Sequence, residues 1–69
     1  MNYKPCEKIT IYAVLKNGKR YKYEATKNSE TIIPKLIKDK FGDKLYGVLV
    51  EKQKFLFGEE LDWTSYWAY

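Results

Sequence analysis

The sequence predicts a small α+β domain, a mostly antiparallel sheet of four to five strands with one helix packed on it. Three observations predict this class: a turn dipeptide between two β-prone runs, a change to helical spacing after residue 30, and two further apolar runs after the helix. A chain of 69 residues has room for one hydrophobic core, so we expect a single domain over residues 1–69. Its expected parts are an N-terminal arm at 1–8, a ββαββ core at 9–58 and an acidic, aromatic C-terminal tail at 59–69.

The first two strands are predicted by the dipeptide Asn17-Gly18, which lies between two β-prone runs. A two-residue loop would set the apolar residues of the first run beside polar residues of the second. A three-residue loop, with Gly18 in the left-handed position of a bulge, instead sets Ala13 opposite Tyr21 and makes one face of the hairpin wholly apolar. We therefore predict the three-residue loop.

A short amphipathic helix is expected after the hairpin. Up to Phe41 the apolar residues recur at spacings of three and four, with charged residues between them, and Gly42 follows as a stop. Pro34 is tolerated only in the first turn of a helix, which places the N-cap at Thr31 or nearby.

A second hairpin is expected to complete the core. The run from Leu45 to Val50 is β-prone, Lys52-Gln53 is expected to form a tight turn, and a partner strand at 55–57 is expected to end at Gly58.

The C-terminal tail fits two structures. Trp63, Ser65, Trp67 and Tyr69 alternate as in a strand, whereas Trp63, Tyr66 and Trp67 also fall on one face of a helix. A segment this short does not decide between a strand and a helix.

The apolar residues that these elements place on their inner faces define an expected core. It consists of Ile9, Ile11, Ala13, Leu15, Tyr21, Tyr23, Ile33, Leu36, Ile37, Phe41, Val48 and Val50.

The ββαββ order, the Gly-bulged first hairpin and the helix that begins near Thr31 resemble the ubiquitin-like β-grasp over about residues 9 to 57. The resemblance implies a topology and no function, because the chain lacks the Gly-Gly end used for conjugation.

The composition excludes most enzyme chemistry. The chain has no His and a single cysteine, Cys6, so it offers no Ser–His or Cys–His pair and no zinc-binding set. The acidic residues Glu59, Glu60 and Asp62 are clustered at a segment start, where such residues usually form a solvated edge. We therefore expect a protein that is not an enzyme, with no cofactor and no metal.

The cellular location is also suggested by composition. A small secreted domain usually carries several cysteines, so one cysteine favours a reducing cytosol. No apolar run has the length of a membrane span, and the N-terminus has no signal-peptide core. The expected location is the cytoplasm, or the host cytoplasm if the protein is phage-encoded, without a membrane partner.

The net charge of +4 has two interpretations. Twelve of the thirteen basic residues are Lys, which fits either contact with polyanions or the codon usage of an AT-rich genome. Residues 1–27 carry seven basic and two acidic residues, whereas residues 59–69 carry three acidic residues and no basic one.

Two sets of residues are candidate binding sites. The first is aromatic, because Trp and Tyr anchor protein interfaces, and consists of Trp63, Tyr66, Trp67 and Tyr69. The second alternates basic and aromatic residues in the first hairpin, since nucleic-acid binding needs cations for the phosphates and rings for the nucleobases. It consists of Tyr12, Lys16, Lys19, Arg20, Lys22 and Lys27.

From these sets we expect a small bacterial or phage protein that binds a larger protein through the aromatic residues and inhibits or modulates it. Nucleic-acid binding by the basic hairpin is the alternative. Self-association as a homodimer, through the tail or an edge strand, is a third hypothesis compatible with either.

Overall fold

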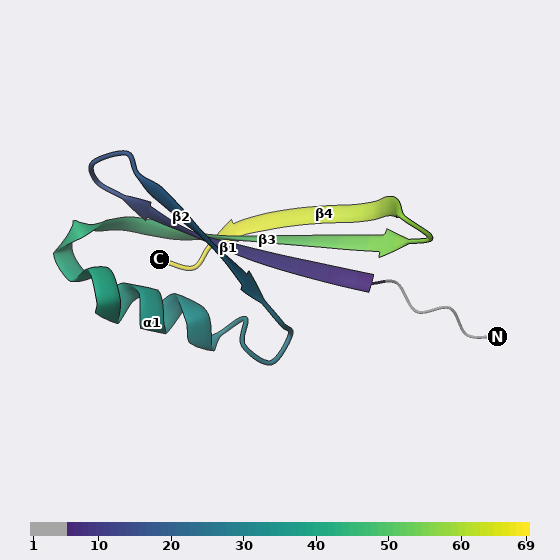
Figure 1. Ribbon diagram of the computed structural model, residues 1–69, viewed down its shortest axis with the longest axis horizontal. Coiled ribbons are helices and arrows are strands. Elements are labelled where there is room, and N and C mark those ends of the chain that lie inside the picture. Colours follow the sequence, from purple (N-terminus) through teal and green to yellow (C-terminus); the bar gives the residue numbers. More distant parts are fainter. Residues whose placement is uncertain (1–5) are drawn as a thin grey trace.

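The computed structural model describes residues 6–69, which form a four-stranded sheet with one α-helix (Figure 1). The elements are β1 (Cys6–Leu15), β2 (Arg20–Ala25), α1 (Ile32–Phe41), a single 3₁₀ turn (Gly42–Lys44), β3 (Leu45–Leu56) and β4 (Glu59–Trp67). The α+β class and the ββαββ order are therefore confirmed. Of the N-terminal arm expected at 1–8, residues 1–5 lie outside the described residues, and the last three belong to β1.

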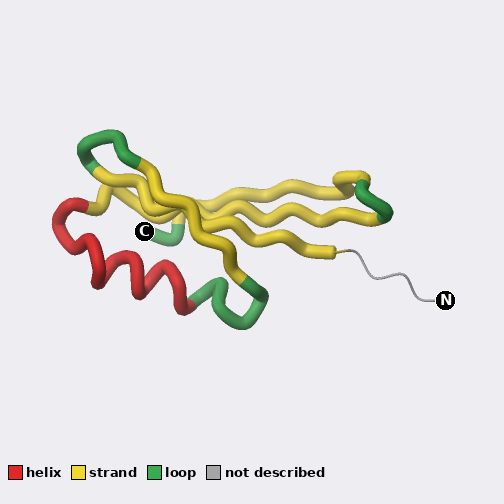
Figure 2. Tube along the Cα trace, viewed as in Figure 1, coloured by secondary structure: helices red, strands yellow, loops and turns green. Residues whose placement is uncertain are grey.

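The strands are arranged in the order β2-β1-β3-β4, and all three pairings are antiparallel. β2 and β3 consequently run in the same direction on either side of β1, and α1 connects them across one face of the sheet (Figure 2). A β-grasp sheet instead has two parallel central strands, so the expected β-grasp topology is wrong beyond the order of elements.

The first hairpin has the expected register. Ala13 pairs with Tyr21 and Ile11 with Tyr23. Gly18 has a φ of 90°, in the left-handed region that the bulge requires, and its N–H donates to the Leu15 carbonyl at 3.0 Å.

The helix begins and ends where the sequence indicates. Thr31 is the N-cap residue, although its side chain makes no capping bond, and Pro34 lies in the first turn. The first N–H groups donate instead to the Ser29 carbonyl, from Ile32 at 3.1 Å and Ile33 at 3.0 Å. Gly42, with a φ of 55°, ends the helix.

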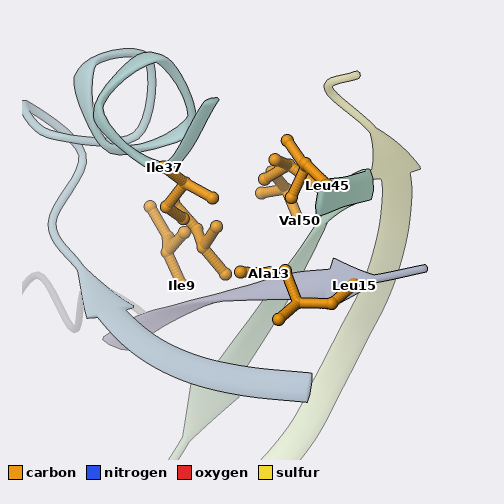
Figure 3. Packing of buried hydrophobic residues seen from close by; sticks show 8 residues of the cluster. Ile9, Ala13, Leu15, Ile37, Leu45 and Val50 are labelled. Atoms are coloured by element: carbon orange, nitrogen blue, oxygen red, sulfur yellow. The ribbon is translucent and has the colours of Figure 1, made fainter. Parts of the chain in front are cut away.

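The core lies between α1 and the sheet (Figure 3). Its buried members are Ile9, Ile11, Ala13, Leu15, Ile37, Leu45, Val48 and Val50, and Tyr23, Ile33 and Phe41 pack against them half-buried. Two predicted core residues lie mainly outside it. Tyr21, on the edge strand β2, is 43% exposed and stacks on Phe41 with ring centroids 5.5 Å apart. Leu36 is 60% exposed, because one helix on a narrow sheet buries only a stripe of its surface.

The prediction for the second hairpin is wrong. Residues 52 and 53 continue β3, pairing with β1 on one side and β4 on the other, and the turn lies five residues later at Phe57-Gly58. Both turn residues have positive φ, 52° and 82°, which is the two-residue turn that matches the twist of hairpin strands. The C-terminal tail is accordingly a strand, β4, rather than a helix.

Candidate binding face and edge strand

α1 covers only one face of the sheet. Ile9, Ile11 and Ala13 point from β1 toward the helix, so by strand alternation the intervening residues of β1 point away from it. We call the side opposite α1 the open face. From the pairing register it carries Lys8, Thr10, Tyr12 and Val14 of β1, Arg20, Lys22 and Glu24 of β2, Gly47, Leu49, Glu51, Gln53 and Phe55 of β3, and Trp63, Ser65 and Trp67 of β4.

A row of basic, aromatic and aliphatic residues crosses the open face from one edge to the other. Lys22 pairs with Tyr12, Tyr12 with Leu49, and Leu49 with Trp67, one residue from each strand. The two candidate sets from the sequence, the basic hairpin and the aromatic tail, therefore meet on one surface.

Trp67 lies over Gly47 on the neighbouring strand. A Cβ atom at Gly47 would come within 3.0 Å of two ring carbons of Trp67 and 2.8 Å of the Tyr69 carbonyl oxygen. Tyr46 meets the same indole edge-on, with centroids 6.2 Å apart and planes at 78°. Glycine thus lets the Trp67 ring approach the sheet, where it remains 55% exposed.

Trp63 belongs to an arm of the sheet. β1, β3 and β4 continue past the end of α1, so this part of the sheet has no helix on either side (Figure 1). Trp63 pairs with Gln53 there and is 53% exposed. At the end of the arm the ring of Phe57 is 77% exposed.

The other two predicted anchors lie on the helix side. Tyr66 pairs with Val50, a core residue, and its ring therefore points to the side that α1 covers. Tyr69 lies beside α1, with the Lys38 ammonium 5.2 Å from its ring centroid. The four aromatic residues of the tail therefore divide into two pairs on opposite faces.

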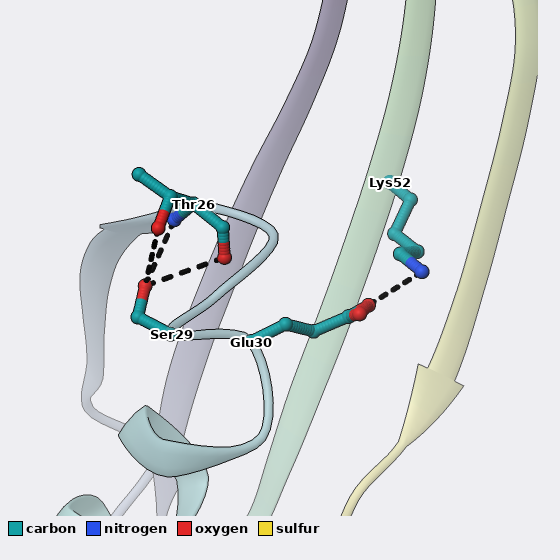
Figure 4. A network of polar contacts seen from close by, with 4 residues as sticks. All are labelled: Thr26, Ser29, Glu30 and Lys52. Atoms are coloured by element: carbon teal, nitrogen blue, oxygen red, sulfur yellow. Dashed lines mark hydrogen bonds and ion pairs between the residues drawn. The ribbon is translucent and has the colours of Figure 1, made fainter.

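An ion pair ties the loop before α1 to β3 (Figure 4). The Lys52 ammonium lies 2.5 Å from Glu30 Oε1, an atom that is shielded from solvent. The hydrogen bond to Glu30 raises the pKa of Lys52. Partial burial raises the pKa of Tyr66, and the negative charge of Glu30 adds to that effect. This cluster braces the loop rather than presenting a reactive group.

The residues of the nucleic-acid hypothesis are only partly brought together. Tyr12, Arg20 and Lys22 share the open face, and Lys16 and Lys19 flank the turn beside Arg20. Lys27 lies beyond the opposite end of β2. Glu24 and Glu51 occupy the same face and reduce its positive potential.

Among residues 6–69, no strand pairs with the outer edge of β4. Ala68 N–H donates to the Val48 carbonyl at 2.8 Å, so alternation directs the backbone groups of Tyr66 toward β3 and those of Trp63, Ser65 and Trp67 outward. One outward donor has a local acceptor: the Trp63 N–H donates to Asp62 Oδ1 at 2.9 Å.

Sequence reasoning missed Gly47 and Leu49, which belong to the open face, and Tyr46, which contacts Trp67 there. The glycine inside a β-prone run was the available signal, because such a residue marks a close approach to the backbone.

Within residues 6–69, no three His, Cys, Asp or Glu residues gather where they could hold a metal ion, and no helix has the length and apolarity to cross a membrane. Cys6 is an exposed free thiol.

Comparison of the chain with family models, curated proteins and solved structures finds no match.

Proposed function

We propose that this protein is a non-enzymatic module that binds a larger protein through the open face of its sheet and thereby inhibits or modulates it. The observation that carries the proposal is the exposure of Trp63 and Trp67, more than half in each case, on a sheet face that no element within residues 6–69 covers. Rings of this kind anchor protein interfaces, where they are buried against the partner. Half-buried Leu49 pairs with Trp67, and half-buried Val14 pairs with Gly47, so both extend the apolar surface.

The setting of this activity follows from the composition. A single cysteine suits a reducing cytoplasm, and the excess of Lys over Arg fits the AT-rich genome of a bacterium or of its phage.

The proposal is tested by capture of the partner from an extract of the source organism. Trp63→Ala and Trp67→Ala should each lower the retained partner about tenfold or more, as interface anchors do. Leu36→Ala is the matched control, because Leu36 is exposed to a similar extent but lies on α1. Equal retention by all three variants would contradict the proposal, and circular dichroism would show whether each variant is folded.

Binding of single-stranded nucleic acid is the second candidate, supported by the row that joins Lys22 and Tyr12 to Trp67. Rings on one face with cations at its edge suit base stacking and phosphate contact. Anisotropy with mixed-sequence strands at about 50 and 200 mM salt tests it, since phosphate contacts make binding fall steeply with salt. Lys22→Ala should weaken such binding, whereas Lys35→Ala on α1 should not.

A further inference from the structure

The two edges of the sheet differ in their protection against pairing with another strand. β2 is six residues long and carries the charged residues Arg20, Lys22 and Glu24. Short length and charge are the devices by which edge strands avoid new partners. β4 is nine residues long, every one of its residues is exposed, and its segment 63–67 contains no charge, no Pro and no Gly. A segment of this composition pairs readily with another strand.

We propose that a second copy of this chain covers the outer edge of β4, in an antiparallel pair with its two-fold axis at Ser65. The inference goes beyond the proposed function and does not depend on it.

The backbone groups are placed for this pairing. Trp63, Ser65 and Trp67 direct their N–H and carbonyl groups outward, and in an antiparallel pair about Ser65 each meets a residue that does the same. Ser65 faces Ser65 of the second copy, and Trp63 faces its Trp67. The outward N–H of Trp63, now held by Asp62, would exchange that carboxylate for a carbonyl.

The side chains are self-complementary in the same register. On the open face the two Trp63–Trp67 pairs would lie beside the small central Ser65 pair, and on the helix side Thr64 would face Tyr66. Aromatic and β-branched residues are the stabilising cross-strand pairs, and no like charges face one another between residues 63 and 67.

Residues 68 and 69 do not lie along this edge. After Trp67 the backbone stays against β3, with Val48 N–H donating to the Tyr69 carbonyl at 3.2 Å, and the Tyr69 ring lies beside Lys38 of α1. The result is an eight-stranded sheet in which the two open faces are continuous and four Trp residues lie where the two β4 strands pair.

The first test is the mass of the protein in solution by sedimentation over about 5 to 200 μM, a range that covers micromolar association. The wild type should reach twice the single-chain mass of 8.2 kDa. Ser65→Lys places two ammonium groups opposite each other at an exposed position and should weaken association about tenfold or more. Asn28→Lys, which adds the same charge in an exposed loop, should associate like the wild type.

A second test locates the axis and does not depend on how Ser65→Lys folds. In a Cys6→Ser background, Ser65→Cys should form an intermolecular disulfide under mild oxidation, because facing hydrogen-bonded residues have Cα atoms about 5.5 Å apart. Lys22→Cys on β2 is the control and should stay reduced. A wild type that stays a monomer throughout, or a dimer in which Ser65→Cys cross-links no faster than Lys22→Cys, would overturn the inference; partner capture through Trp63 would be unaffected by either result.

Discussion

Gly47 shows how one residue shapes the open face. It stands where any larger side chain would meet the Trp67 ring and the Tyr69 carbonyl, so its lack of a Cβ atom sets how closely the last residues approach β3. The same contact holds Trp67 in place on the surface that we propose binds a partner.

Gly47→Ala should therefore lower the free energy of unfolding by about 1–3 kcal/mol, the usual cost of adding a methyl group to a tightly packed contact. Chemical denaturation measures the loss, and Trp fluorescence in a Trp63→Phe background reports the displacement of Trp67. A variant within about 0.5 kcal/mol of the wild type, with unchanged fluorescence, would contradict the close contact.

Lys52 is the cationic partner of a carboxylate that has little access to water. Lys52→Met should cost about 1 kcal/mol of stability, because Glu30 loses its cation. Lys54→Met, an exposed position on the same side of β3, serves as the control and should cost less. The double variant Glu30→Gln/Lys52→Met should recover part of the lost stability, because the amide carries no charge. A double variant less stable than Lys52→Met alone would contradict a stabilising role of the ion pair.

The same cluster predicts a loss of stability at alkaline pH. The pKa values of Lys52 and Tyr66 are both raised by folding, so the folded chain retains protons that the unfolded chain releases. Their contribution is fully present below about pH 10 and is lost as the pH rises through the folded-state pKa values. Urea denaturation at increasing alkaline pH measures this loss, and it should be smaller in Tyr66→Phe. A loss of the same size in that variant would count against a role for Tyr66.

Among the helices and strands, the sequence predicts those features that depend on the conformational preferences of single residues. Asn17-Gly18 and Pro34 each allow few backbone conformations, so the first hairpin register and the helix start follow from them. The length of β3 does not follow from local preferences, because residues 52–54 are polar and would suit a turn equally well. They remain in a strand because their backbone pairs with β1 on one side and with β4 on the other.

The sequence predicts which residues belong to the candidate site, but not that they share one surface. The sequence identifies Trp63, Trp67 and Tyr12, but their common face depends on the pairing of β3 with both β1 and β4. That pairing joins residues far apart in the chain, and no local pattern specifies it.

The β3–β4 turn carries a strain that a substitution can remove. Phe57 has a φ of 52°, a conformation that costs most residues free energy and that Asn adopts readily. Phe57→Asn should raise the free energy of unfolding by about 0.5–1 kcal/mol, measured by chemical denaturation. Phe57→Ala separates the loss of the ring from the relief of strain and should not stabilise the protein. Equal stability of the Asn and Ala variants would show that backbone strain is not the deciding factor.

At the scale of the whole molecule, one helix covers only part of a long sheet. The consequence is a domain with one packed side, one open side and an arm that lacks helical cover on both. We propose two contacts for this shape, a larger protein on the open face and a second copy at the β4 edge. The two adjoin, because Trp63 and Trp67 belong to both.

The most direct test of the open face as the binding surface is hydroxyl-radical footprinting of the captured complex against the free protein at the same chain concentration. A concentration below the range of self-association is used, so that pairing at the β4 edge does not protect the same Trp residues. Binding through the open face predicts that Trp63, Trp67 and Tyr12 are protected in the complex, whereas exposed Leu36 and Tyr21 on the helix side react as in the free protein. Protection of Leu36 and Tyr21 with unchanged reactivity of the two Trp residues would contradict it and place the partner on the opposite side of the molecule.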